Sequence, residues 1–219
     1  YIIPSLIYLF RQSYPYITVI NHIQYTRSAI SDVIGGNFSL GIISQPASVG
    51  TDVLCCEPLM EDPLVLVVHP QHPWAEKRGI LFKEITEETL LISNPNTSLV
   101  NYLEKEGRLS LEPSRLYVAG NIEAIKRGIR NHQGISIMSE YAVRQELELG
   151  LLKQVPLLDH PGLKRQLYTI SVRIPGLNCP PVCFWNFSGR PRRITGFCPS
   201  YRQVHASILN HQLRKSSAV

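Results

Sequence analysis

The sequence predicts an α/β fold, in which short β-strands alternate with amphipathic helices along most of the chain. Short apolar runs rich in Val, Ile and Leu recur, and the strongest of them is PLVLVVHP at residues 63–70. Segments with apolar residues at helical spacing separate these runs, and the connections are short. Such alternation is typical of a sheet covered by helices. Because unbroken apolar runs suit strands buried on both faces, we expect parallel strands.

The first part of the chain predicts two helices. Residues 1–13 carry an apolar face, and Tyr14-Pro15 ends this helix because proline cannot continue the hydrogen-bond ladder. A second helix is expected at residues 26–34, followed by Gly35-Gly36 as its C-terminal stop. Strands are expected at residues 17–20, 40–43, 53–59 and 63–70.

The alternation continues through the middle of the chain and is lost after Pro175. Strands are expected at residues 90–93, 116–120, 135–138, 151–157 and 164–173. Helices are expected to run to Gly107 from the Asn-Pro-Asn-Thr-Ser segment at 94–98, to begin at Asn121 with this residue as the N-cap, and to cover 139–149. Residues 180–187 and 203–213 are candidates for two further short helices.

The charge of the chain is unevenly distributed. The net charge is +5, but residues 188–219 hold six of the 22 basic residues and no acidic one. Residues 1–187 therefore carry 16 basic against 17 acidic residues and are about neutral, so we do not expect a nucleic-acid surface there. The basic tail is expected to be a solvated terminus, with contact to phosphates or an acidic partner as the alternative.

Composition and cysteine usage indicate a globular protein of a reducing compartment. The chain is 44% hydrophobic and 18% charged, and no apolar run approaches the roughly 18 residues of a membrane span. Five cysteines without framework spacing favour the cytoplasm over a secreted disulfide scaffold. Cys179 and Cys183 lack two further well-spaced zinc ligands, so no metal or other cofactor is expected. Buried or incidental thiols are favoured over redox sensing.

No motif in the sequence supports an enzyme. Gly-x-Ser-x-Gly, His-Glu-x-x-His and Gly-x-Gly-x-x-Gly are all absent, and the seven histidines show no pairing pattern. His69 and His72 are three residues apart, but the prolines beside them favour a turn over a metal site. His132 lies between a helix and a strand. A turn role is favoured there over a cleft or interface contact and over catalysis, because histidine tolerates the left-handed conformation better than most residues.

Two helix starts carry polar side chains that suit a small anion. They are Asn96-Thr97-Ser98 and Gln24-Tyr25-Thr26. Free N–H groups and the helix dipole favour a carboxylate or sulfate at such positions. The same residues could simply cap their helices. Both segments follow expected strands, where open α/β sheets tend to bind ligands, so both interpretations stay open.

Several ordered stretches resemble the effector-binding domain of LysR-type transcriptional regulators, over about residues 1–187. The most specific is GNIEAIK at 120–126 followed by GISIMS at 134–139. The others are IP…F…YP within 3–15, VIGGNFSLGI at 33–42, DPLVLVV…HP within 62–73 and ELELGLL at 146–152. The resemblance implies two Rossmann-like lobes of the type 2 periplasmic-binding-protein kind. Residues 1–59 and 151–173 would form lobe I, 60–150 lobe II, and 174–219 a C-terminal helix and basic tail.

The resemblance also implies the function: a small-molecule effector held between the lobes modulates DNA-dependent transcription, without catalysis. The hydroxyl-rich helix starts at residues 24–26 and 96–98 indicate that this effector is an anion. Thr26 matches an effector-contacting hydroxyl of the first lobe, and residues 96–98 match the helix start that faces it from the second. Gly120 and Asn121 match a further turn lining the cleft. The expected effector-binding residues are Gln24, Tyr25, Thr26, Asn96, Thr97, Ser98, Gly120 and Asn121.

The expected partners are the effector, DNA and further copies of the chain. The family binds DNA through a winged helix-turn-helix that this sequence lacks, and it forms homodimers or homotetramers. The chain begins at Tyr1 rather than methionine, so we expect a fragment whose first lobe also lacks its first strand. Ser39 stands where the family usually has aspartate. The alternatives are an extracytoplasmic solute-binding protein of a transporter and an enzyme on a similar two-lobed scaffold.

Overall fold

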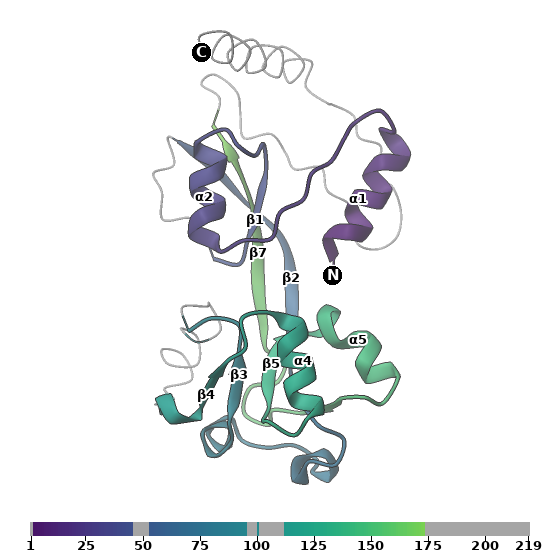
Figure 1. The fold of residues 1–219 in the computed structure, drawn as a ribbon, viewed down its shortest axis with the longest axis vertical. Helices are drawn as coiled ribbons and strands as arrows, with labels where there is room; N and C mark the ends of the chain where they lie inside the picture. Colours follow the sequence, from purple (N-terminus) through teal and green to yellow (C-terminus); the bar gives the residue numbers. More distant parts are fainter. Residues whose placement is uncertain (1, 46–52, 96–99, 101–111, 174–219) are drawn as a thin grey trace.

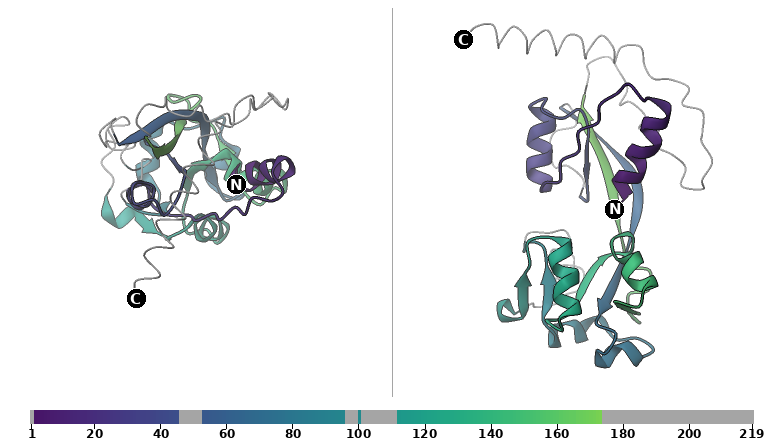
Figure 2. Two further views of the ribbon diagram at one scale, coloured as in Figure 1. Left: turned by 90° about the horizontal axis from the view of Figure 1, so that it is seen from above. Right: turned by 45° about the vertical axis from the view of Figure 1, so that its right-hand side comes forward.

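The structure, a computed structural model, describes residues 2–45, 53–95, 100 and 112–173, which form two lobes joined by two long strands (Figure 1). Strand β2 (Leu54–Val68) begins in one lobe and ends in the other, and β7 (Lys164–Val172) runs antiparallel beside it. The right-hand view of Figure 2 shows these two connecting strands between the lobes from another side. We call the part that holds β1 and α2 lobe I, and the part that holds β3 and α4 lobe II.

Lobe I confirms two predicted helices and one predicted strand. Helix α1 covers Ile2–Ser13, α2 covers Thr26–Ile34 and β1 covers Gly41–Ile43. Strand β1 pairs antiparallel with β7, with Gly41 opposite Ile170. A small core of Val33, Ile43, Leu54 and Ile170 holds α2 against these strands. The start of α2 is therefore fixed by apolar packing along the rest of the helix.

The strand predicted at residues 17–20 is wrong. The chain is irregular between α1 and α2, and Ile17, Val19 and Ile20 are exposed. β-branched residues favour a strand only where a neighbouring strand accepts their backbone hydrogen bonds. Within the described part of the chain, no strand pairs with this segment.

Lobe II contains the remaining described strands and helices. The strands are β3 (Leu90–Ile92), β4 (Leu116–Val118), β5 (Ser136–Ser139) and β6 (Lys153–Val155). The helices are α4 (Ile122–Arg130) and α5 (Glu140–Glu148), with three short 3-10 helices that were not predicted: η1 (Pro73–Glu76), η2 (Phe82–Glu87) and η3 (Pro113–Arg115). The helices expected from residues 94–98 to 107, at 180–187 and at 203–213 lie outside the described residues, apart from a helical Val100.

Strand β2 corrects two expectations. The strands predicted at 53–59 and 63–70 are one strand, whose register shifts between Pro58 and Met60. Its partners β5, β6 and β7 are all antiparallel, and among the named strands parallel pairing is confined to β3 and β4. The apolar run is nevertheless buried on both faces, since Leu66 and Val68 enter one core while Val65 and Val67 enter another. Burial on both faces therefore does not require a parallel sheet.

Residues 152–163 pack with lobe II. Strand β6 pairs with Leu66–Val68 of β2. Leu157 and Leu163 lie in the same core as Trp74 and Phe82. The chain therefore leaves lobe II only where β7 begins.

Two of the five cysteines, both in β2, lie among the described residues. Cys55 is buried but disulfide-bonded, so the expectation of a buried or incidental thiol is wrong at this position, whereas Cys56 is a free thiol. None of the helices in the described part of the chain is long and apolar enough to cross a membrane.

Candidate functional site

Helices α2 and α4 both begin at the end of their lobe that faces the other lobe (Figure 1). The first turn of a helix exposes backbone N–H groups without intrahelical acceptors, and the helix dipole places partial positive charge there. Residues 24–26 and 120–121 therefore lie at two facing, positively polarised helix ends.

The start of α2 is not capped by a side chain. Tyr25 occupies the N-cap position in an extended conformation and makes no side-chain capping bond, and Thr26 is the first helical residue. The Tyr25 carbonyl accepts the amide of Ala29 at 2.9 Å. Gln24 and Tyr25 are exposed and Thr26 is half-buried. Two interpretations were left open for this segment, helix capping and anion binding. The N-cap residue makes no capping bond, so it does not support the first, and the first-turn N–H groups can face a ligand.

The start of α4 is capped, as predicted. The Asn121 side-chain oxygen Oδ1 accepts the amide of Ala124 at 2.9 Å. This bond uses the oxygen, so the amide nitrogen Nδ2 is the group that could donate to a ligand. Gly120 precedes it with φ 81°, in the left-handed region where glycine carries no steric penalty. No described atom lies within 4 Å of the position a Cβ would take at Gly120, so this turn is open on that side.

Asn96, Thr97 and Ser98 lie outside the described residues. The strand that leads toward them, β3, is parallel to β4, and its last residue Ile92 lies opposite Val118. The loops after β3 and β4 therefore leave the same edge of the sheet, which is the edge that carries Gly120.

Helix α4 is tied to α5 by a buried lysine that sequence reasoning missed. The Lys126 side chain is 7% exposed, and its Nζ lies 2.7 Å from Glu146 Oε1 and 2.8 Å from Glu123 Oε1. The Ala142 carbonyl accepts a further bond at 3.3 Å. Glu123 stands three residues from the lysine and was visible as a helical pair, but Glu146 lies on another helix, so no local pattern pointed to it.

The other end of α4 carries His132, whose turn role is confirmed. Its φ is 57°, in the left-handed region, at the turn between α4 and β5. Its ring packs against that of His69 in a tilted arrangement, with centroids 3.6 Å apart and an interplanar angle of 38°, a contact that was not predicted. Partial burial, together with His132 and His72 nearby, lowers the pKa of His69 below its ordinary value. His69 and His72 each accept a backbone N–H through Nδ1, from Gln71 and Trp74, which confirms the predicted turn.

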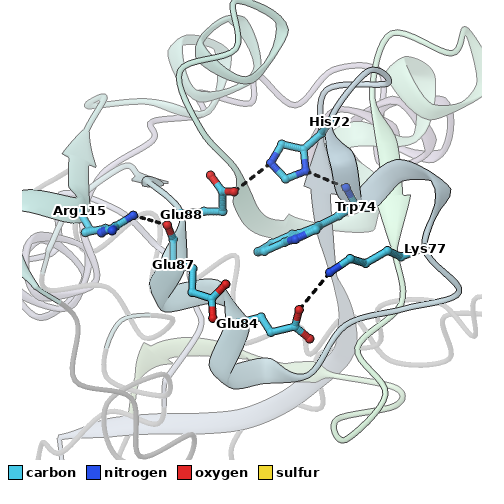
Figure 3. A network of polar contacts seen from close by, with 7 residues as sticks. All are labelled: His72, Trp74, Lys77, Glu84, Glu87, Glu88 and Arg115. Atoms are coloured by element: carbon cyan, nitrogen blue, oxygen red, sulfur yellow. Dashed lines mark hydrogen bonds and ion pairs between the residues drawn. The ribbon is translucent and has the colours of Figure 1, made fainter.

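A network of polar contacts holds the connecting turns at this end of lobe II (Figure 3). His72 Nε2 lies 3.4 Å from Glu88, Lys77 lies 3.1 Å from Glu84, and the Arg115 guanidinium donates to the Glu87 carbonyl. The amide of Leu81 donates to Glu84, and this bond, helped by Lys77, lowers the pKa of that carboxyl. These contacts join η1, η2 and η3, so we assign them a structural role.

Named regulators are similar to this chain over most of its length. A protein named "Probable RuBisCO transcriptional regulator" from Cyanidium caldarium is 31% identical over 176 residues, which cover 78% of this chain and 55% of that protein. The protein of the same name from Cyanidioschyzon merolae is 29% identical over 178 residues, covering 78% and 58%. The chain therefore spans little more than half the length of these curated relatives.

Solved structures share the fold. The CcmR regulatory domain of Synechocystis, in complex with 2-PG, matches with a TM-score of 0.68 and 25% identity over 81% of this chain and 84% of that one. A full-length BenM variant matches with a TM-score of 0.64 and 23% identity over 78% of this chain and 56% of that one. The predicted α/β fold of the periplasmic-binding-protein kind is thereby confirmed.

The family assignment rests on most of the chain. The family model "LysR substrate binding domain" matches residues 1–173, which is somewhat shorter than the stretch of about 187 residues expected from the motifs. The match contains every strand and helix described above. The chain belongs to the family of LysR substrate-binding domains.

Proposed function

We propose that this chain is the ligand-sensing domain of a LysR-type transcriptional regulator and that it holds a small anionic effector between lobes I and II. The observation that carries this proposal is the start of α2, whose N-cap side chain makes no capping bond, on the side of lobe I that faces lobe II. An effector would there accept hydrogen bonds from the first-turn N–H groups and the Thr26 hydroxyl.

The electrostatics of the facing helix ends favour an anion. A helix N-terminus carries roughly half a unit of positive charge, and its free N–H groups suit carboxylate, phosphate or sulfate oxygens. In this proposal Gln24, Tyr25 and Thr26 approach the effector from lobe I, and Gly120 and Asn121 approach it from lobe II. Asn96, Thr97 and Ser98 complete the site, and the exit of β3 at the same sheet edge as Gly120 supports their inclusion.

The compound 2-PG is the first effector to test, because it is bound in the CcmR regulatory domain at 25% identity. For this chain we propose only the class of effector, a small anion, and not a particular compound. Inorganic phosphate and sulfate are the simplest members of that class and separate a general anion site from a selective one.

We propose that lobe I comprises residues 1–59 and 164–173, and lobe II residues 60–163. The boundary expected at residue 151 is moved because β6 pairs with the lobe II half of β2. Strands β2 and β7 would then be the two hinge segments. For residues 174–219 the expectation from the sequence is unchanged.

We infer the remaining properties from the family and its relatives. The regulator would bind DNA through a winged helix-turn-helix outside this sequence, assemble as a homodimer or homotetramer, and work in the cytoplasm without catalysing a reaction. The similar proteins are named regulators, which supports this reading over a transporter's solute-binding protein. The coding sequence upstream of Tyr1 distinguishes the two: a winged helix-turn-helix supports the proposal, and a secretory leader contradicts it.

Thermal-shift and calorimetric titrations test the site with 2-PG, phosphate, sulfate and a panel of organic acids. Thr26→Ala and Ser98→Ala should each weaken a positive response by about tenfold in Kd, as expected for one hydrogen bond to a charged group. Ser31→Ala, a further hydroxyl loss along the same helix, is the control and should leave Kd unchanged. If both site variants bind as the wild type does, the assignment is wrong.

A further inference from the structure

The crossing between the lobes has a weakened backbone ladder over one short stretch of β2. Pro58 and Pro63 face Tyr168 and Lys164 of β7, and neither proline has an N–H to donate. Between them the register shifts at Pro58–Met60, so a residue of β2 is left out of the regular pairing. Backbone hydrogen bonds alone therefore hold this stretch less firmly than the rest of the strand.

A glutamine side chain takes over part of the pairing at the register shift. Gln166 Nε2 donates to the Met60 carbonyl at 2.9 Å and to the Leu167 carbonyl at 2.8 Å. Next to it, Glu61 and Lys164 form an ion pair at 2.7 Å with both side chains more than half exposed. A pair exposed to that degree contributes about 1 kcal/mol or less, because water and salt screen it.

Asp62 differs from these neighbours because its carboxylate is buried and fully engaged. Its side chain is 2% exposed, and Oδ2 accepts a bond from Arg165 Nε of β7 at 2.7 Å. Oδ1 accepts a bond from the Ser139 hydroxyl at 2.6 Å. Ser139 occupies the N-cap position of α5 but makes no capping bond, so its hydroxyl serves Asp62 instead. One carboxylate thus joins β2, β7 and the junction of β5 with α5.

We propose that the hinge between the lobes lies at the Pro58–Met60 shift and that Asp62 is the positioning residue that fixes its lobe II end. This inference rests on the proposed function, in which the lobes move when an effector binds. Beyond Asp62, the strands and the start of α5 move as one body. Before it, the interrupted ladder bends, with Gln166 bridging the shift. A charge-assisted bond is about twice as strong as a neutral one, so flexure is concentrated on the side that lacks the carboxylate.

Hydrogen–deuterium exchange of the whole 219-residue chain, without ligand, tests the inference. In the wild type, amides at 59–61 and 167–168 should exchange faster than those at 64–66. Asp62→Asn should raise the exchange rate by about tenfold or more at residues 164–166 and 139–142, because local opening there no longer breaks one strong hydrogen bond. The exchange rates of α4 and β3 should stay unchanged. Glu61→Gln, the matched control in the same crossing, should change exchange less than about twofold.

The outcomes separate a hinge clamp from a general contribution to stability. Equal acceleration in α4 and β3, or no acceleration anywhere in Asp62→Asn, overturns the proposal. Ser139→Ala and Arg165→Gln each remove one of the two bonds and should each reproduce part of the local effect, so the result stands if Asp62→Asn fails to fold. The same exchange measurement repeated with 2-PG tests the proposed function separately. If 2-PG does not change the exchange of the wild-type protein, this result counts against the proposed effector site. The comparison of wild type and Asp62→Asn without ligand still decides the role of Asp62.

Discussion

Substituting alanine for Gly134 places a methyl group where the backbone that leads into β3 already lies. A Cβ at Gly134 would stand 2.1 Å from the Thr89 carbonyl oxygen and 2.6 Å from Leu91 Cδ1. The Thr89 carbonyl is held in place because it accepts the amide of Ile135 at 2.9 Å. The φ of Gly134 is 145°, a region that a residue with a Cβ rarely adopts. The substitution therefore requires both the turn and the entrance to β3 to shift.

The magnitude follows from these two contributions. Overpacking of a core contact costs about 1–3 kcal/mol, and a strained backbone conformation costs about 1–3 kcal/mol more. We expect Gly134→Ala to lower the free energy of unfolding by about 2–6 kcal/mol and, in a chain of this size, the Tm by roughly 10 °C. Urea and thermal unfolding followed by circular dichroism measure both quantities.

Gly150→Ala is the matched control. Gly150 has φ 68°, but no described atom lies within 4 Å of where its Cβ would be. Only the conformational penalty of about 1–2 kcal/mol applies there. If Gly134→Ala destabilises the protein no more than Gly150→Ala does, the close packing of the α4–β5 turn against β3 is refuted.

Lys126→Met and His132→Asn test two contacts of the α4 region, the ion pair with α5 and the ring contact with His69. Lys126→Met should lower the free energy of unfolding by about 2–4 kcal/mol in urea, because it leaves Glu146 half-enclosed without its cation, whereas Glu123→Gln should cost about 1 kcal/mol or less. Equal losses would show that the buried pair is not the stabilising one. Because the pKa of His69 is lowered in the folded protein, the unfolded state binds more protons once the pH falls to the ordinary pKa of 6.5, so the free energy of unfolding should decrease as the pH drops through and below about 6.5. His132→Asn, which keeps a residue tolerant of left-handed φ, should flatten this dependence in unfolding measured across pH; an unchanged slope would contradict the coupling of the two rings.

Sequence patterns correctly predicted those features of the fold that depend on residues close together in the chain. The bounds of α2, the Asn121 cap and the left-handed turn at His132 all depend on residues within a few positions of one another. The candidate helix starts were predicted for the same reason, since a strand exit followed by polar residues is a local signal. Their facing arrangement across the two lobes came only from the resemblance.

The features that sequence reasoning missed depend on partners far apart in the chain. The strand expected at 17–20 needed a neighbour that the described residues do not supply. Asp62 and Arg165 are 103 positions apart, and no periodicity links them. The direction of pairing around β2 was mispredicted for a related reason, because an apolar run records burial and not the direction of the strand beside it.

The central claim is that an anion binds between the lobes at the facing helix ends, and an NMR titration of the ¹⁵N-labelled chain tests it most directly. With 2-PG, phosphate, sulfate and organic acids added in turn, a saturable response is predicted. Its largest amide shifts should fall at residues 26–28 of α2 and at Gly120 and Asn121. Saturable shifts confined to other parts of the chain, or no saturable response to any of these anions, would contradict the claim.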